Sequence, residues 1–146
     1  FTRIGPEAIS KDFNKTYLSK ILKNRNKNIK NLLLDQKLVS GLGNIYVNEI
    51  LYQAKINPFK KSHLIDLDEN KRIIKYSKII LKKAIHFGGS SIRDFKGTTG
   101  KSGNFQSEFK VYDREEKRCS RNKCSGLIRR KIISNRSTFM CTVCQK

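Results

Sequence analysis

The sequence predicts a mainly α-helical protein that ends in a small β-hairpin, and two observations lead to this fold class. Up to residue 88 the apolar residues recur at three- and four-residue spacing, which is typical of amphipathic helices, and no cysteine occurs. Beyond residue 107 the chain has residues typical of strands and all four of its cysteines. We therefore predict a helical module over residues 1–88, a loop over residues 89–107 and a cysteine-bearing hairpin module over residues 108–146.

Two short helices open the helical module. A turn at Gly5-Pro6-Glu7-Ala8 precedes the first helix, which Ser10 or Asp12 can cap through a side-chain oxygen. Its apolar stripe consists of Phe13, Tyr17, Leu18, Ile21 and Leu22. The polar run over residues 23–28 ends this helix, and the second helix follows with Ile29, Leu32, Leu33 and Leu34.

Two longer helices complete this module. Gly41 and Gly43 can both take positive φ and interrupt the pattern, and Asn44 then starts a helix that ends at Asn57-Pro58. The apolar face of this helix contains Ile45, Val47, Ile50, Leu51 and Ala54. The next helix begins after the possible cap Asp68 and stops at Gly88. Lysines occupy one face of it, and the other face contains Ile73, Ile74, Ser77, Ile80, Leu81, Ala84 and Ile85.

The second module is predicted to consist of a long loop and short strands. Residues 89–107 are rich in Gly, Ser and Thr, and loops of this length in compact domains are usually functional or disordered. Residues 109–112, 127–133 and 137–140 have strand composition, with Ser134-Asn135-Arg136 as the turn between the last two. The expected result is a β-hairpin flanked by pairs of cysteines.

The charge of the chain indicates an anionic partner. It has 32 Lys and Arg against 12 Asp and Glu, a formal net charge of +20. So large an excess repels itself in the folded state, so nucleic acid is the first partner to test. No apolar run reaches the 18 or so residues of a membrane span, and the first ten residues lack the apolar stretch of a signal peptide. We expect a soluble, intracellular protein with no membrane partner.

The four cysteines form two close pairs. Four residues separate Cys119 from Cys124, two separate Cys141 from Cys144, and sixteen lie between the pairs. This spacing favours one structural Zn²⁺ held by four thiolates, which leave no open position for a reacting water. Two disulfides or four free thiols are the alternative. His63 and His86 are each isolated, and we expect them to be surface or packing residues rather than ligands.

A second candidate site precedes the predicted helix that starts at Asn44. The free backbone N–H groups that follow Gly43 can point at a phosphate, and the Asn44 side chain adds a donor. Lys30 can reach the same phosphate. A packing corner between two helices is the alternative for this pattern. The sequence has no pair of carboxylates and no Ser/His/Asp arrangement that would mark a self-contained active site.

Several motifs together resemble one family. These are LDQKLVSGLGNIYVNEILYQAKINP (34–58), GGSSIRDF (88–95), GKSGNF (100–105), FKVYDRE (109–115) and NRSTFMCTVCQK (135–146). In this order they resemble the bacterial formamidopyrimidine-DNA glycosylase family. The resemblance implies a helix-two-turns-helix domain followed by a β-hairpin zinc finger, both of which bind damaged double-stranded DNA.

The resemblance also implies roles for particular residues. Lys30 and Asn44, with Gly43, match the phosphate-binding part of the helical domain. Arg136 matches the zinc-finger arginine, which contacts a phosphate beside the lesion and is assigned as proton donor in δ-elimination. Lys101 falls in the loop that covers the extruded oxidised purine. For Arg136 and Lys101 the alternative is a solvated basic residue on a turn.

The chain departs from the family pattern at three places. The first cysteine pair has four intervening residues where the family usually has two, and a DNA-contacting lysine of the family aligns with Asn26, so Arg25 or Lys27 would have to replace it. The family's nucleophile is an N-terminal proline, whereas this chain starts at Phe1, and its Pro6-Glu7 aligns with the interdomain hinge. We therefore expect a C-terminal part that lacks the N-terminal catalytic domain.

The resemblance implies a base-excision-repair enzyme when that domain is present in cis. The intact protein would flip out 8-oxoguanine or a formamidopyrimidine, cleave the glycosidic bond and nick the abasic strand by β,δ-elimination. We expect the chain alone to be a monomer that binds DNA without glycosylase activity, in the bacterial cytoplasm at the nucleoid. The alternatives are an endonuclease VIII-like glycosylase for oxidised pyrimidines and a stand-alone nucleic-acid-binding zinc protein.

Overall fold

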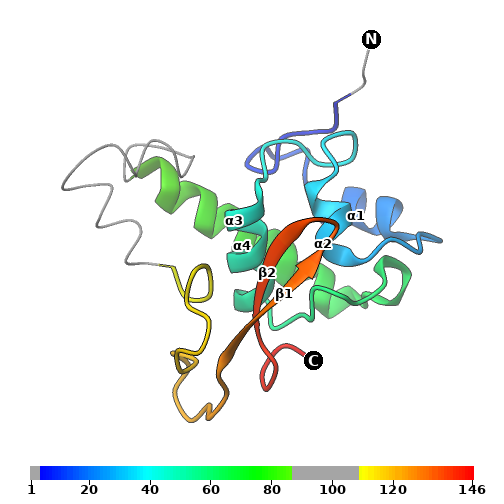
Figure 1. Ribbon diagram of the computed structural model, residues 1–146. Helices are drawn as coiled ribbons and strands as arrows, with labels where there is room; N and C mark the ends of the chain where they lie inside the picture. Colours follow the sequence, from blue (N-terminus) through cyan, green and yellow to red (C-terminus); the bar gives the residue numbers. More distant parts are fainter. Residues whose placement is uncertain (1–3, 87–108) are drawn as a thin grey trace.

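A computed structural model describes residues 4–86 and 109–146, and it shows four helices followed by one hairpin (Figure 1). The elements in chain order are α1 (Lys15–Leu22), α2 (Ile29–Leu34), α3 (Asn44–Gln53), a turn of 3-10 helix (Ser62–Leu64), α4 (Leu67–His86), β1 (Ile128–Ile133) and β2 (Arg136–Cys141). The mainly α-helical fold class with a terminal hairpin is thereby confirmed. The predicted loop over residues 89–107, the helix stop at Gly88 and the Lys101 site lie outside the described residues.

The first helix begins later than predicted. Asn14 is its N-cap, and the Asn14 side chain accepts a 2.9 Å hydrogen bond from the Tyr17 N–H. Ser10 and Asp12 were the expected caps, and this prediction is wrong. The Ser10 hydroxyl donates to the Glu7 carbonyl, because residues 7–13 fold into consecutive turns before the helix starts.

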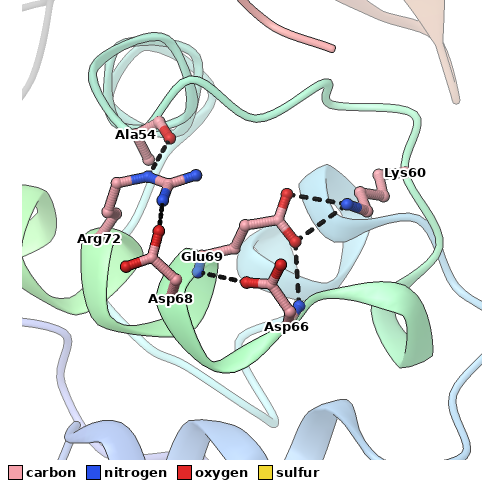
Figure 2. Close-up of polar contacts among 6 residues, drawn as sticks. All are labelled: Ala54, Lys60, Asp66, Asp68, Glu69 and Arg72. Atoms are coloured by element: carbon pink, nitrogen blue, oxygen red, sulfur yellow. Dashed lines mark hydrogen bonds and ion pairs between the residues drawn. The ribbon is translucent and has the colours of Figure 1, made fainter.

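Helix α4 begins with a reciprocal pair of hydrogen bonds rather than at Asp68 (Figure 2). Asp66 accepts from the Glu69 N–H at 2.8 Å, and Glu69 accepts from the Asp66 N–H at 2.9 Å, which is the arrangement of a capping box. The same Glu69 carboxylate accepts two bonds from the Lys60 ammonium, at 2.9 and 2.8 Å. Asp68 instead pairs with Arg72 on the next turn of the helix.

The main core lies between the helices. Helix α3 packs against α2, α4 and β2, so it has neighbours on several sides. The fully buried members of this core with the largest side chains are Phe13, Leu18, Ile29, Leu32, Leu33, Leu42, Ile50, Leu51 and Ile56. On α4 the predicted stripe is buried at Ile73, Ser77, Leu81 and Ala84, whereas Ile85 is 59% exposed near the end of the helix. No helix within residues 4–86 or 109–146 has the length and apolar character that crossing a membrane requires.

The lysine face of α4 contains one residue that packs inward. The Lys78 ammonium donates to the Ala8 and Ser10 carbonyls and lies 5.3 Å from the centre of the Phe13 ring. Burial, with a smaller contribution from Lys82, lowers the pKa of Lys78. Part of the positive charge on α4 therefore holds the N-terminal segment in place.

The hairpin is an antiparallel pair with Ile128 opposite Cys141 and Ile133 opposite Arg136. Ser134 and Asn135 form its turn with φ values of 49° and 65°, the left-handed conformation that two-residue hairpin turns require. Arg136 is therefore the first residue of β2. We had predicted that it belongs to the turn, and this prediction is wrong. Figure 1 shows the hairpin lying across the helices, and β2 contacts α3.

The predicted strand over residues 109–112 is not formed. The backbone N–H groups of Lys110, Val111 and Tyr112 donate to the Glu49 carboxylate, at 2.8, 3.0 and 2.8 Å. Because a side chain of α3 occupies these three donors, they cannot bond to a neighbouring strand. The apolar side chains that suggested a strand pack into the core instead, and both Phe109 and Val111 are buried.

Candidate nucleic-acid interface and metal centre

One polar stripe of α3 joins the helical module to the hairpin module. Asn44, Asn48 and Tyr52 follow one another at four-residue spacing, and Glu49 lies beside them. Each of these four side chains bonds to a residue between 110 and 139. The predicted apolar residues of α3 are also buried, with Val47, Ile50 and Leu51 fully inaccessible to solvent. Helix α3 therefore connects the helical module to the hairpin module.

The carbonyl oxygen of Ser137 is the point where the two modules meet. It accepts from the Lys30 ammonium at 3.0 Å, from the Asn44 side-chain amide at 3.1 Å and from that of Asn48 at 3.4 Å. Lys30 also donates to the Thr138 hydroxyl at 2.6 Å. Because three donors from two helices converge on one oxygen, the start of β2, and with it Arg136, is held against the helical module.

This convergence brings together three of the predicted DNA-binding residues. Lys30 and Asn44 both contact Ser137, and Arg136 is the neighbouring residue with an exposed side chain. Lys30 itself is fully buried and lies beneath the hairpin, where its ammonium bonds to Ser137 and Thr138. Burial, and then the charge of Arg136, lowers the pKa of Lys30 to about 8. The site concentrates positive charge at the start of β2.

The N-terminus of α3 has the expected form with one correction. Gly43 is its N-cap and offers no side chain to the free N–H groups of the first turn. Only Gly41 takes a positive φ, of 90°, whereas Gly43 has φ of −101° and is extended. The Asn44 Oδ1 atom is buried without a hydrogen-bond partner. These groups form a polar corner beside Ser137 and Arg136.

The residues around Asn26 are only partly available to a ligand. Lys27 forms an ion pair with Asp35 at 3.0 Å, and the Arg25 carbonyl lies 2.9 Å from the Nδ1 atom of His63. Asn26 is exposed. Asn31, a few residues further, donates to the Ser134 hydroxyl at 3.1 Å and so links α2 to the hairpin turn.

Glu49 attaches the segment that leads into the metal site. Its side chain is 4% exposed and accepts the three N–H groups of residues 110–112. Burial raises the pKa of Glu49, while these hydrogen bonds act in the opposite direction. The carboxylate thus replaces a strand partner for this segment and ties it to the middle of α3.

The four cysteines meet in one cluster that fits a tetrahedral metal ion. All four Sγ atoms lie within 4.8 Å of one another, with Cys119 to Cys144 at 3.8 Å and Cys124 to Cys141 at 3.7 Å. Tetrahedral Zn²⁺ with Zn–S bonds of about 2.3 Å needs sulfur atoms about 3.8 Å apart. The thiols are free, so the disulfide alternative does not describe this structure. The residues present therefore fit a four-thiolate metal site.

Neighbouring residues shape this cluster. A Cβ atom at Gly126 would lie 2.6 Å from the Cys141 Sγ, so only glycine fits there. The Tyr52 hydroxyl lies 3.0 Å from the Cys119 Sγ, and burial followed by this contact raises the pKa of Tyr52 to about 12. The hydroxyl therefore stays protonated and can donate to a thiolate. Among the described residues, His63 and His86 are not part of any such cluster.

Sequence reasoning missed several residues of this interface. These are Asn48, Glu49 and Tyr52 on α3, and the four-residue spacing of Asn44, Asn48 and Tyr52 was the available signal. Gln145 donates to the Ile56 carbonyl at 3.0 Å and accepts from the Cys141 N–H at 2.8 Å. A buried glutamine beside the last cysteine had no such signal, because its partner lies 89 residues away.

The fold and the site define a class of protein. In it a helical module packs against a four-cysteine hairpin through one helix, and basic residues gather where the two modules meet. The chain matches the family described as "Formamidopyrimidine-DNA glycosylase H2TH domain" over residues 4–96. It belongs to the formamidopyrimidine-DNA glycosylase family. The resemblance that the motifs indicated is thereby confirmed.

Individual relatives agree with this assignment. The formamidopyrimidine-DNA glycosylase of Roseobacter denitrificans is 45% identical over 143 residues, which cover 98% of this chain and 50% of the relative. A crystal structure of the Lactococcus lactis enzyme, non-covalently bound to DNA containing an AP site, is 39% identical with a TM-score of 0.85, covering 99% of this chain and 51% of that one. A complex of the same enzyme with DNA containing FAPY-dG is 40% identical, with a TM-score of 0.85 and coverage of 98% and 51%.

Two consequences follow from these relatives. The chain spans about half the length of the curated relatives it matches. Their names favour the formamidopyrimidine branch over an endonuclease VIII-like protein or a stand-alone zinc protein.

Proposed function

We propose that the chain is the C-terminal, DNA-binding part of a bacterial base-excision-repair glycosylase for oxidised purines. The convergence of Lys30, Asn44 and Asn48 on the Ser137 carbonyl carries this proposal, because it fixes Arg136 beside the N-terminus of α3. Two structural neighbours are complexes with DNA that contains an AP site or FAPY-dG. The ligand of this chain is accordingly double-stranded DNA with an oxidised base or an abasic site, bound by a monomer at the nucleoid in the cytoplasm.

The phosphate backbone beside the lesion is the group that these residues recognise. Arg136 contributes an exposed guanidinium, the α3 N-terminus contributes free N–H groups behind Gly43, and Asn44 contributes an amide. Lys30 adds positive charge from beneath the hairpin. Lys101 is proposed to act in the loop that covers the extruded base. Together these groups position the DNA without reading its sequence.

One structural zinc ion belongs to this proposal. Cys119, Cys124, Cys141 and Cys144 would hold it, since their Sγ atoms already have tetrahedral spacing. When bound, the ion closes the base of the hairpin and leaves no open position for a substrate. The hairpin then presents Arg136 in a fixed direction.

The chemistry is divided between this chain and the catalytic domain that the family has at its N-terminus. Arg136 is proposed as the proton donor in δ-elimination, the step that follows β-elimination at the abasic site. Pro6 does not supply the nucleophile, because its nitrogen is part of a peptide bond and its carbonyl accepts the Ser40 N–H at 2.9 Å. The intact enzyme is thus a glycosylase and lyase, whereas the chain alone binds without cleaving.

Binding of a fluorescent duplex with an abasic-site analogue tests this proposal. We expect Arg136→Ala to weaken binding roughly tenfold, as for the loss of one charge-assisted contact, and to lower the salt dependence by about one unit of log–log slope. Arg129→Ala is the matched control, because Arg129 is an exposed arginine of the same hairpin that pairs with Glu116. Equal losses in the two variants would remove Arg136 from the site.

Borohydride trapping on DNA with an abasic site tests the division of chemistry. A Schiff base requires a reactive amine, and we expect no covalent adduct from this chain. An adduct would show that the chain contains a nucleophile of its own. Binding of undamaged and abasic duplexes with equal affinity would instead favour a stand-alone nucleic-acid-binding protein.

A further inference from the structure

Arg121 lies in the turn between Cys119 and Cys124 and bonds in two directions. Its Nη1 atom donates to the Cys144 Sγ at 2.8 Å. Its Nη2 atom donates to the Tyr52 carbonyl at 2.7 Å and is 3.3 Å from the Gln53 carbonyl. The guanidinium carbon also lies 4.2 Å from the centre of the Tyr52 ring. One side chain therefore touches both the metal site and the last turn of α3.

The end of α3 is a favourable place for a cation such as Arg121. The last carbonyl groups of a helix have no partner within the helix and carry partial negative charge. Helix α3 has no basic residue in its own last turn. Arg72 on α4 donates from its Nε atom to the carbonyl of the C-cap residue Ala54 at 2.8 Å. Arg121 adds a second cation, from the hairpin module, at the Tyr52 carbonyl. Its planar fork suits this position, because separate N–H groups can point at a carbonyl and at a sulfur at the same time.

The metal site needs the same charge. Four thiolates around a divalent cation leave a net charge of about −2, and a hydrogen bond from a cation to one sulfur offsets part of it. Tyr52 contacts Cys119 on one side of the cluster, and Arg121 contacts Cys144 on the other. Both contacts link the cluster to the C-terminal turn of α3.

We propose that Arg121 is a positioning residue that fastens the metal centre, through Cys144, to the C-terminus of the helix whose N-terminus carries Asn44. The inference rests on the proposed zinc site. Arg121 lies in the four-residue spacing that distinguishes the first cysteine pair from the usual pattern of the family. The longer turn is therefore part of the attachment between the metal centre and the DNA-binding helix.

Zinc release from the full chain tests this role. The measurement is the rate at which zinc-loaded protein loses its metal to a chromophoric chelator. We expect Arg121→Ala to release zinc about tenfold faster than the unaltered chain, the usual effect of removing a hydrogen bond to a metal ligand. Arg121→Lys should lie in between, because lysine keeps the charge but not the fork. Arg118→Ala is the control, since Arg118 is exposed and its removal changes the net charge equally.

Two further measurements separate positioning from general destabilisation. In cobalt-substituted protein, Arg121→Ala should shift the thiolate-to-metal charge-transfer band, and Arg118→Ala should leave it unchanged. At saturating zinc, Arg121→Ala should weaken binding of the abasic-analogue duplex more than Arg118→Ala does. If Arg121→Ala fails to fold, the release rate of Arg121→Lys decides the question.

The outcomes distinguish this inference from the proposed function. Equal zinc release, equal cobalt spectra and equal DNA binding in the Arg121 and Arg118 variants would overturn the role of Arg121 alone. An unaltered chain that holds no zinc would overturn the proposed metal site, and with it the basis of the inference. Release that is faster in Arg121→Lys than in Arg118→Ala supports it.

Discussion

Glu49 and Glu69 are both buried glutamates on long helices, but their partners differ in kind and in distance along the chain. Glu69 pairs with the Lys60 ammonium and with the Asp66 N–H, nine and three residues away, and so completes the start of its own helix (Figure 2). Glu49 has no cation within hydrogen-bond reach among the described residues and accepts three neutral backbone N–H groups, 61 to 63 residues away. The first carboxylate stabilises the helical module, and the second attaches the other module to it.

The difference shows where this fold is vulnerable. A local ion pair forms between residues that are already close, whereas three amides from a distant segment are aligned only when both modules are folded. The same helix that carries Glu49 also carries Asn44 and Asn48, so damage at Glu49 is expected to reach the proposed DNA-binding residues. Damage at Glu69 should remain in the helical module.

Glu49→Ala is expected to have the largest effect. It leaves three backbone donors without partners, one in a buried residue and two in partly buried residues, and unsatisfied buried donors cost about 1–3 kcal/mol each. We expect a loss on the order of 3 kcal/mol or more in the free energy of unfolding, together with weaker DNA binding. Urea unfolding and fluorescence anisotropy measure the two effects. Glu115→Ala, at an exposed glutamate, is the control, and a Glu49 variant that behaves like it would contradict the role described here.

Lys60→Met is expected to have the next largest effect. It leaves Glu69 with the Asp66 N–H but without its cation, at a site where Lys60 is 27% and Glu69 9% exposed. Breaking such a pair should cost about 2 kcal/mol, less than a fully buried pair because solvent reaches the lysine. Urea unfolding measures this loss. DNA affinity of the folded variant should stay unchanged, and a parallel loss of affinity would show that the two regions are not independent.

Lys30→Met tests the charge beneath the hairpin, with an expected effect of about tenfold on DNA affinity, or about 1.4 kcal/mol. Methionine fills the buried site, and Asn44 and Asn48 still donate to the Ser137 carbonyl. Because the pKa of Lys30 is about 8, the unaltered chain should lose affinity as the pH rises through 8 and the ammonium is deprotonated. Anisotropy titrations measure the DNA affinity of the two proteins from about pH 7 to about pH 9, roughly one unit on either side of that pKa. Parallel pH profiles would show that the Lys30 charge does not contribute to binding.

The smallest effect is the pH dependence contributed by Glu49. Burial raises its pKa above that of an unfolded glutamate, so the folded state holds the proton more tightly. Its contribution to stability is therefore fully present below the unfolded pKa and declines as the pH rises through the folded pKa. As the pH rises over that range, the unfolding free energy of the unaltered chain should fall relative to that of Glu49→Gln. A difference that is constant with pH would contradict the raised pKa.

Much of the fold was predictable because it depends on local patterns. The apolar spacing located α2 and α3, and the strand composition on either side of Ser134-Asn135 located the hairpin. The caps of α1 and α4 were placed at the wrong residues, because several Asp, Ser and Asn side chains precede each helix and only the turn geometry selects one. Residues 109–112 were predicted as a strand, because their composition does not reveal that a glutamate takes their N–H groups.

The sequence by itself determined the helical and hairpin modules, because their elements depend on patterns within a few positions. It also determined the spacing of the four cysteines and the identity of the basic residues. Only the tertiary structure decided that Lys30 is buried, that three donors meet at the Ser137 carbonyl, and that Arg121 reaches the end of α3. These contacts join residues about 70 to 110 positions apart, as shown by separations of 69 for Arg121 to Tyr52 and 107 for Lys30 to Ser137. Such pairings arise from the packing of whole elements, and no local pattern in the chain encodes them.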